Sequence, residues 1–403
     1  MSNARYRIEF PKNEPVNNYA PGTPERARLK QALKALGQTE VDIPVIINGE
    51  AVETGNTREC VMPHDHGHVL GRAQLAGRDE VEAAIKAAQA AYPAWSRMDW
   101  ADRLSIFLKA ADLLAGPWRD RVNASTMLGV SKNAYQAEID VACELADFLR
   151  FNAYFATELY AQQPVSSPDM WNRVEYRPLE GFVFAVTPFN FTSIAGNLPT
   201  APAMMGNVVL WKPASSAIYP SWFVMQVLLE AGLPPGVINF IPGKGSAVGD
   251  MVMTNENLAG IHFTGSTGTF QHLWKQVGDN LENYRTYPRI VGETGGKDFI
   301  VAHPSADPKV LQTALIRGAF EYQGQKCSAA SRAYLPASLW EEIRDPLVEE
   351  VASLKMGDPT DFRNFVNAVI DQAAFDTIKE YAKEAGYSER VRFRRRNREF
   401  VPL

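Results

Sequence analysis

Hydrophobic residues follow a helical pattern through the first part of the chain. Within 79–94, Val81, Ala84, Ile85 and Ala88 recur at i, i+3, i+4 and i+7, the spacing that puts side chains on one helix face. The apolar run at 43–48, closed by Gly49, predicts a strand and a turn, and the more polar 174–179 predicts one arm of a hairpin. The helical patterns predict helices over 25–36, 79–94 and 101–114, and one long helix, or two separated by a break, over 131–160.

The pattern changes at Gly181, after which short apolar runs alternate with helical segments. This alternation predicts βαβ units and an α/β fold with a parallel sheet buried on both faces. Such sheets bind ligands at the carboxyl ends of their strands. The expected strands are 182–187, 207–212, 237–241, 261–263 and 299–303, and the expected helices are 219–231, 245–254, 270–277 and 311–320.

Composition narrows the class of protein. The 403 residues are 46% hydrophobic and 22% charged, with a formal net charge of −5. This apolar content excludes a disordered chain, and the mild negative charge disfavours a basic nucleic-acid binder. No apolar stretch is long enough to span a membrane, and the first ten residues resemble neither a secretory signal nor a transit peptide. We therefore expect a cytoplasmic location, with the mitochondrial matrix as the alternative.

Two sequence features resemble sites without supporting one. His64, His66 and His68 alternate like a metal patch, but a turn before a strand at 69–73 explains them better, and we expect no metal. The last 13 residues, 391–403, hold five arginines and one glutamate, so they carry +4 while the other 390 residues sum to −9. A basic tail this short on an acidic chain is a poor nucleic-acid site.

Cysteine usage points to one candidate nucleophile. Cys60, Cys143 and Cys327 lie far apart in sequence, which favours reduced thiols over a disulfide framework. Cys327 follows the flexible Gly324, is flanked by Lys326 and precedes small residues, and a nearby cation would favour its reactive thiolate. The alternative is a buried structural cysteine, the interpretation that we give to Cys60 and Cys143.

Polar residues also follow the predicted strands. Glu293, before two glycines in VGETGGKD, is a candidate general base if an apolar site raises its pKa, or else an exposed turn residue. Asn190, in TPFNF, is a candidate oxyanion donor or an ordinary Asx turn. Lys212 ends a strand and could reach a ribose or phosphate, or be solvated. The glycine-containing turn FTGSTG, 263–268, precedes a helix and could hold a pyrophosphate, although many turns look alike.

These motifs together, in this order, resemble the aldehyde dehydrogenase superfamily from about residue 40 to about residue 388. TPFNF, WKPA, FTGS, ETGGK and GQKCSAASR stand where that family has its functional segments. The resemblance implies a Rossmann-like NAD-binding domain plus an incomplete α/β catalytic domain. The implied divisions are an N-terminal arm at 1–40, the NAD-binding domain at 41–296 with a short oligomerisation-type arm near 165–180, a partial catalytic domain at 297–388, and a non-family tail at 389–403.

The resemblance also implies roles for individual residues. Cys327 would attack the aldehyde, Asn190 and the Cys327 N–H would hold the oxyanion, and Glu293 would activate water. Ser215 stands where many members have glutamate, so the ribose contact alone does not choose NAD over NADP. The implied cofactor is NAD; the implied substrate residues are Phe191 and Ser328, and the implied cofactor-binding residues are Thr187, Lys212, Ser215, Gly245, Gly265, Ser266, Thr267, Gly268 and Thr269.

The segment IEFPKNEPVNNYAPGT, together with the motifs around Asn190 and Cys327, resembles the branch of the family that oxidises L-glutamate γ-semialdehyde to glutamate in proline catabolism. Phe270 supports this branch. Two alternatives stay open: a truncated, non-catalytic relative that at most binds nucleotide, and a dehydrogenase for another aldehyde. Members of the family form homo-oligomers and continue past Tyr387. The Arg-rich tail is expected to arise from a frameshift or an alternative exon.

Overall fold

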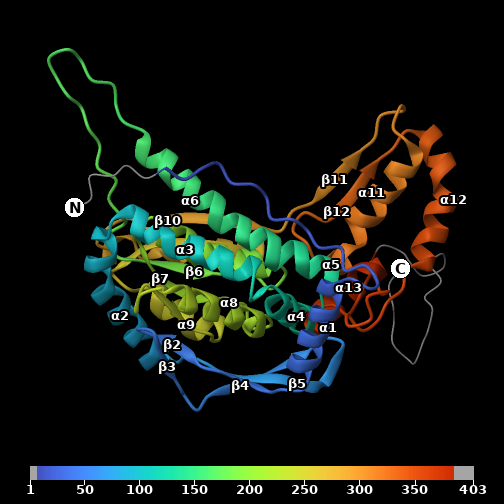
Figure 1. Cartoon of the computed structure of the whole chain (residues 1–403), viewed down its shortest axis with the longest axis horizontal. Coiled ribbons are helices and arrows are strands. Elements are labelled where there is room, and N and C mark those ends of the chain that lie inside the picture. The colour runs from blue at the N-terminus through green and yellow to red at the C-terminus, as the bar shows by residue number, and fades with distance from the viewer. Residues whose placement is uncertain (1–6, 385–403) are drawn as a thin grey trace.

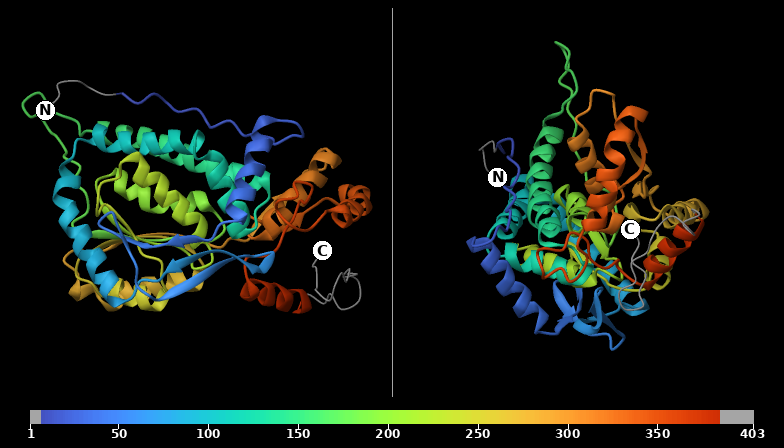
Figure 2. Two further views of the ribbon diagram at one scale, coloured as in Figure 1. Left: turned by 60° about the horizontal axis from the view of Figure 1, so that its bottom comes forward. Right: turned by 90° about the vertical axis from the view of Figure 1, so that its right-hand side faces the viewer.

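The computed structural model describes residues 7–384 as a large α/β body and a smaller unit that projects from one end (Figures 1 and 2). The large body is built around a seven-stranded sheet of order β10-β9-β6-β7-β8-β2-β3, in which β6 to β10 are parallel to one another and β2 pairs antiparallel with β8 and β3. Its strands are β2 (Val45–Ile47), β3 (Glu50–Val52), β6 (Phe182–Val186), β7 (Val208–Lys212), β8 (Ile238–Phe240), β9 (Leu258–Gly265) and β10 (Arg289–Thr294).

Helix contacts divide the helices around this sheet into two groups. One group packs α7 and α8 together under α3, α4 and α6, and the other packs α2, α9 and α10 together. Buried strands such as Val208–Lys212, with every residue inaccessible, fit a sheet covered on both faces. The helices are α2 (Arg78–Arg97), α3 (Trp100–Ala115), α4 (Arg119–Val130), α6 (Leu145–Ala161), α7 (Thr192–Met204), α8 (Ile218–Ala231), α9 (Gly245–Met253) and α10 (Thr267–Asp279).

Smaller elements surround this core. A three-stranded sheet, β1-β5-β4, packs against α4 and α8, and α1 packs on α4. The projecting unit pairs two parallel strands with two helices around a separate small core of Leu311, Leu339 and Ile343. The bounds are α1 (Pro24–Gly37), β1 (Val41–Ile43), β4 (Thr57–Met62), β5 (Asp65–Gln74), β11 (Asp298–Val301), α11 (Pro308–Phe320), β12 (Ala330–Tyr334), α12 (Ala337–Ser353) and α13 (Gln372–Glu384), with short 3₁₀ turns η2 (Leu281–Asn283) and η3 (Glu321–Gly324).

The N-terminal arm lies along α6 (Figure 1). The Phe10 ring contacts the rings of Phe151 and Tyr154, and Glu14 pairs with both Arg150 and Arg119. This segment is therefore fixed to the body by apolar and charged contacts. The tail at 389–403 lies outside the described residues.

Most predicted helices and strands are present, but three expectations were wrong. The strand predicted at 43–48 is divided at Pro44, because proline lacks an N–H; β1 joins the small sheet and β2 the large one. The histidines predicted to lie in a turn are partly in β5, which begins at Asp65. The segment 174–179 forms no strand. The long helix predicted over 131–160 is present as one continuous helical run, made of α5 (Ala134–Ala137), the π-helix η1 (Glu138–Glu144) and α6.

Candidate active site

In the large sheet, the direction in which successive strands are added reverses beside β6. The chain moves from β6 to β7 and β8 on one side, and then returns to β9 and β10 on the other. Loops at the carboxyl ends of β6 and β9 therefore lead away in opposite directions, which creates the crevice where such sheets bind ligands. Val186 lies opposite Lys212 on one side and Phe263 on the other. Three of the predicted motifs, TPFNF, WKPA and FTGS, thus converge at one edge of the sheet.

Asn190 lies in the loop between β6 and α7. Its side-chain nitrogen donates a hydrogen bond of 2.9 Å to the Gln325 carbonyl, two residues before Cys327. A primary amide has two N–H donors, so the second remains available to a ligand oxygen. Thr187, at the start of the same loop, is buried and accepts a 3.1 Å hydrogen bond from the Trp211 indole. The loop is thus anchored at both ends.

Cys327 follows a tightly constrained turn between α11 and β12. Tyr322, Gln323 and Gly324 all have positive φ angles, of 52°, 57° and 70°. The Cys327 thiol is half-buried and lies 3.5 Å from a Glu293 carboxylate oxygen. Burial raises the pKa of this thiol, and the adjacent Glu293 carboxylate raises it further, against smaller opposing effects of backbone N–H groups. The resting site therefore favours the protonated thiol.

Lys326 does not supply the activating cation that the sequence suggested. Its ammonium points to Glu321, 3.0 Å away, and Glu321 also pairs with Arg317. The two cations hold the pKa of Glu321 below its usual value, although burial opposes them. Lys326 therefore stabilises the start of the turn.

Glu293 lies on β10, not in a turn, opposite Thr264 of β9. Its side chain is exposed, as in the second of the two interpretations, and not in the apolar surroundings that would raise the pKa of a general base. The preceding residue, Gly292, faces Phe270: a Cβ at this position would meet the ring at 2.1 Å. Phe270 therefore packs directly against the strand that carries the candidate base.

Lys212, at the end of β7, is buried, in contrast to the solvated alternative. Its ammonium makes one hydrogen bond among the described residues, of 3.2 Å to the Pro213 carbonyl, and so has donors to spare. Burial lowers its pKa to about 8. Ser215, half-buried, follows three residues later. A buried cation with unused donors fits the hydroxyl groups of a ribose.

Two helix N-termini lie beside these residues. α9 begins at the exposed Gly245, and α10 begins after Ser266, whose side chain caps the helix by accepting from the Thr269 N–H. The two helices contact each other. Helix N-termini offer backbone N–H groups to anions, so this pair fits a pyrophosphate. Around them, Gly265 is half-buried, and Ser266, Thr267, Gly268 and Thr269 are exposed.

A buried charged cluster behind the Asn190 loop was missed by sequence reasoning. Lys132 pairs with Asp140 at 2.8 Å, and both are inaccessible. Glu144 accepts from the Ser193 hydroxyl at 2.8 Å, and burial raises its pKa to about 6. The only signal was the presence of charged residues within the apolar stretch 138–146. Phe191 contacts Lys132, with the ammonium 4.2 Å from the ring centroid, whereas Ser328 is exposed beside Cys327.

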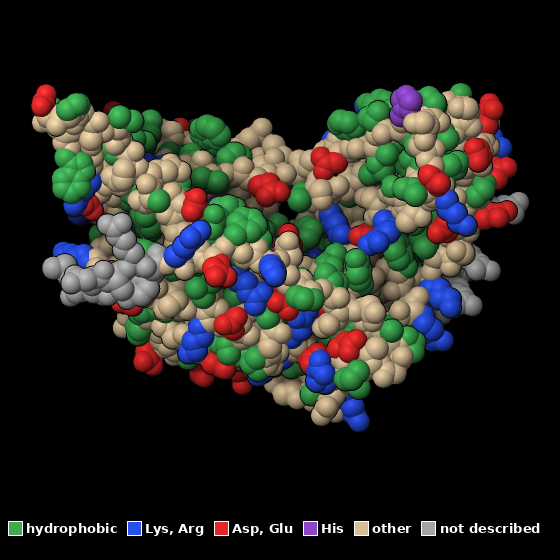
Figure 3. All heavy atoms as spheres, turned by 45° about the horizontal axis from the view of Figure 1, so that its top comes forward, with side chains coloured by type: hydrophobic (Ala, Val, Ile, Leu, Met, Phe, Trp, Pro, Cys, Tyr) green, Lys and Arg blue, Asp and Glu red, His purple; other side chains and the backbone are tan. Residues whose placement is uncertain are grey.

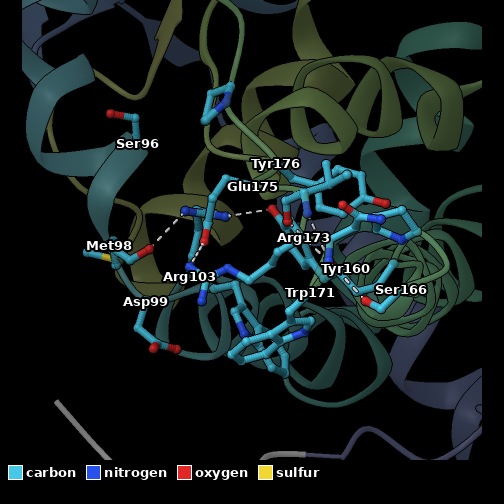
Figure 4. A pocket seen from close by; sticks show the side chains of 16 residues that line it. Ser96, Met98, Asp99, Arg103, Tyr160, Ser166, Trp171, Arg173, Glu175 and Tyr176 are labelled. Atoms are coloured by element: carbon cyan, nitrogen blue, oxygen red, sulfur yellow. Dashed lines mark hydrogen bonds and ion pairs between the residues drawn. The ribbon is translucent and has the colours of Figure 1, made fainter. Parts of the chain in front are cut away.

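Other features lie apart from these residues. A cavity of about 510 Å³ lies between the 163–178 excursion and the start of α3 (Figure 4). Arg103 donates there to the Met98 carbonyl and to the Tyr160 hydroxyl, and none of the predicted site residues lines the cavity. Within residues 7–384, no group of three or more His, Cys, Asp or Glu side chains is placed to hold a metal. No helix of that range is long and apolar enough to cross a membrane.

Comparisons with known proteins agree with this geometry. A model described as "Aldehyde dehydrogenase family" matches residues 51–391. A Δ1-pyrroline-5-carboxylate dehydrogenase from Agaricus bisporus is 50% identical over 385 residues, covering 95% of this chain and 70% of the relative. A mitochondrial one from Homo sapiens is 50% identical over 374 residues, covering 93% of this chain and 66% of the relative.

Solved structures give the same result. The NAD-bound Δ-pyrroline-5-carboxylate dehydrogenase from Mycobacterium tuberculosis has a TM-score of 0.94 and 52% identity, covering 97% of this chain and 74% of that one. A Thermus 1-pyrroline-5-carboxylate dehydrogenase with bound NAD has a TM-score of 0.89 and 30% identity, covering 94% and 73%. The predicted fold class and resemblance are confirmed, and the chain spans about 70% of the length of such relatives.

Proposed function

The chain belongs to the aldehyde dehydrogenase family, and we propose that it oxidises L-glutamate γ-semialdehyde, the open form of Δ1-pyrroline-5-carboxylate, to L-glutamate with NAD. The relatives at about 50% identity that carry this enzyme name support the substrate and the cofactor. The observation that carries the chemistry is the contact between Cys327 and Glu293, 3.5 Å apart, next to the loop that holds Asn190.

The first step is attack of the Cys327 sulfur on the aldehyde carbon, with the thiol proton passing to Glu293. A carboxylate in contact with the thiol is placed to take that proton. The free N–H of Asn190 and the Cys327 backbone N–H stabilise the oxyanion that forms. NAD, when bound, accepts the hydride. Glu293 releases the thiol proton to solvent and then takes a proton from the water that attacks the thioester. It passes this proton to the departing Cys327 thiolate, which frees glutamate and restores the thiol.

NAD fits the residues at the sheet edge. The spare donors of Lys212, with Ser215, suit the adenine ribose, and the N-termini of α9 and α10, with Gly245 and Gly265–Thr269, suit the pyrophosphate. Thr187 would lie beside the nicotinamide. Phe191 and Ser328 would contact the substrate.

The hollow between the large body and the projecting unit supports a two-domain assignment (Figure 3). We assign 41–296 to NAD binding and 297–388 to a partial catalytic domain, and the separate core of the projecting unit supports this division. The 165–180 excursion, with Trp171 83% exposed, would contact a second copy of the chain. A reducing compartment suits the three free cysteines: the cytoplasm, or the mitochondrial matrix that several relatives' names specify.

Steady-state formation of NADH from a panel of aldehydes tests this proposal. We expect turnover with Δ1-pyrroline-5-carboxylate to exceed that with acetaldehyde. The opposite preference would select a dehydrogenase for another aldehyde. Binding of NAD to folded protein without any oxidation would select a non-catalytic nucleotide binder. The same panel run with NADP decides between the two cofactors.

A further inference from the structure

The buried pair formed by Lys132 and Asp140 touches both halves of the proposed catalytic apparatus. Lys132 lies between α4 and α5, and Asp140 lies in η1. Both residues are 1% exposed, and their charged groups are 2.8 Å apart. Burying two charges is costly, and replacing such a pair with apolar residues is often neutral or stabilising. Stability alone therefore does not explain its presence.

Asp140 holds the beginning of α7. Its two carboxylate oxygens accept hydrogen bonds from the backbone N–H groups of Thr192 and Ser193, at 3.0 and 2.8 Å. The N-cap residue of α7 is Phe191, which has no side-chain acceptor. Asp140 thus supplies, from a different helix, the cap that the local sequence lacks. Asn190 immediately precedes Phe191, so this cap fixes the position of the oxyanion donor.

Lys132 contacts the turn that carries the nucleophile. Its ammonium lies 4.2 Å from the Phe191 ring centroid and 4.7 Å from that of Tyr322, a distance range that favours cation–π attraction. Tyr322 is the first of the three left-handed residues before Cys327. Left-handed backbone at Tyr322 and Gln323 costs free energy and persists only where surrounding contacts enforce it. The fully buried Tyr322 hydroxyl, bonded to the Val130 carbonyl at 2.8 Å, and Lys132 are such contacts.

We propose that Lys132 and Asp140 form a positioning pair that holds Asn190 and Cys327 in register for attack on the aldehyde. One carboxylate fixes the segment that bears the amide, and the cation bonded to it clamps the turn that bears the thiol. The hydrogen bond from the Asn190 side chain to the Gln325 carbonyl also joins the two segments directly. The effect of this pair on catalysis rests on the proposed function, whereas its effect on the two segments does not.

The structural consequence is tested by hydrogen exchange in Lys132→Met and Asp140→Asn. Asp140→Asn keeps the side-chain volume and one oxygen acceptor, so the test can still be made if Lys132→Met does not fold. We expect either substitution to speed exchange in both segments, 190–194 and 322–328. Glu138→Gln is the matched control, because Glu138 is buried in the same π-helix but faces Tyr19, Arg119 and Asn123. It should loosen the N-terminal arm instead. Exchange that changes in only one segment, or equally in the control, would overturn the proposal.

The catalytic consequence is tested by kinetics with Asn190→Ala. We expect Lys132→Met to lower kcat about 10²-fold without changing the KM for NAD, because small misplacements of reacting groups have effects of that size. Asp140→Asn combined with Asn190→Ala should cost little more than Asn190→Ala alone, since the amide on the segment that Asp140 caps is already gone. Losses that multiply would refute a positioning role while leaving the proposed function intact. If the wild type shows no turnover, the proposed function fails and the exchange experiment still decides the positioning claim.

Discussion

Replacement of Asn190 by alanine separates the two hydrogen-bonding roles of one amide. In the resting structure one N–H is bonded to the Gln325 carbonyl at 2.9 Å, and the other has no hydrogen-bond partner among residues 7–384. Loss of the bonded N–H should reduce the free energy of unfolding by about 1 kcal/mol, the net value of an ordinary hydrogen bond. Loss of the free one removes an oxyanion donor, which costs about 10² to 10³ in kcat. The catalytic effect should therefore be far larger than the effect on stability.

The assay combines initial rates of NADH formation with urea unfolding. Asn197→Ala is the control: Asn197 lies on the same α7 and accepts a 2.8 Å hydrogen bond from Asn152, away from Cys327. It should lose a similar amount of stability and keep its kcat. An Asn190→Ala enzyme that retained most of its kcat, or a control that lost as much, would refute the assignment of Asn190 to the oxyanion.

Three further substitutions test neighbouring claims. Lys212→Met should raise the KM for NAD about tenfold or more, because it removes a buried charged donor. Since burial lowers the pKa of Lys212 to about 8, the unfolded chain binds the extra proton between pH 8 and 10.5, so wild-type stability relative to this variant should rise with pH across that window. Glu293→Gln should speed alkylation of Cys327 near neutral pH, because the carboxylate raises the thiol pKa, while it abolishes thioester hydrolysis. Gly292→Ala should cost about 1–3 kcal/mol of stability by displacing Phe270.

The substitutions of Lys212 and Gly292 each have a matched control. Lys275→Met removes an exposed lysine paired with Asp279 and should leave the KM for NAD unchanged. Gly278→Ala, where a new Cβ meets nothing within 4 Å inside α10, should be neutral or stabilising, as alanine is the better helix former. Equal effects in a variant and its control would contradict the roles given to Lys212 and Gly292. A difference in stability between wild type and Lys212→Met that does not change with pH would contradict the lowered pKa of Lys212. An unchanged alkylation rate in Glu293→Gln would contradict the effect of Glu293 on the thiol pKa.

The sequence predicted the parallel sheet well because its strands are buried on both faces. The residues of β7, for example, are all buried, and the first four of them, 208–211, form a continuous apolar run. It failed for α4, in which ten residues including Asn123, Ser125 and Thr126 are buried, so no polar face gives a helical period. It also failed for β10, an exposed edge strand whose residues Arg289–Thr294 alternate poorly.

The candidate site divides along similar lines. Cys327, Glu293 and Asn190 could be predicted because distinctive short motifs surround them. Lys132 and Asp140 could not, because their importance lies in contacts with Thr192, Ser193 and Tyr322, which are remote in sequence. The activating role suggested for Lys326 failed for a related reason: its partner Glu321 is visible in sequence, but the direction of the side chain is not.

The central claim is that Cys327 is the nucleophile of an aldehyde oxidation. Its most direct test is the rate of NADH formation from Δ1-pyrroline-5-carboxylate by Cys327→Ala, with Cys60→Ala as the control. Cys60 suits this purpose because burial raises the pKa of its thiol to about 11 and makes it a poor nucleophile. We expect Cys327→Ala to fall to the background rate while Cys60→Ala keeps its activity. A Cys327→Ala protein that still produced NADH at a rate near that of the wild type would contradict the account.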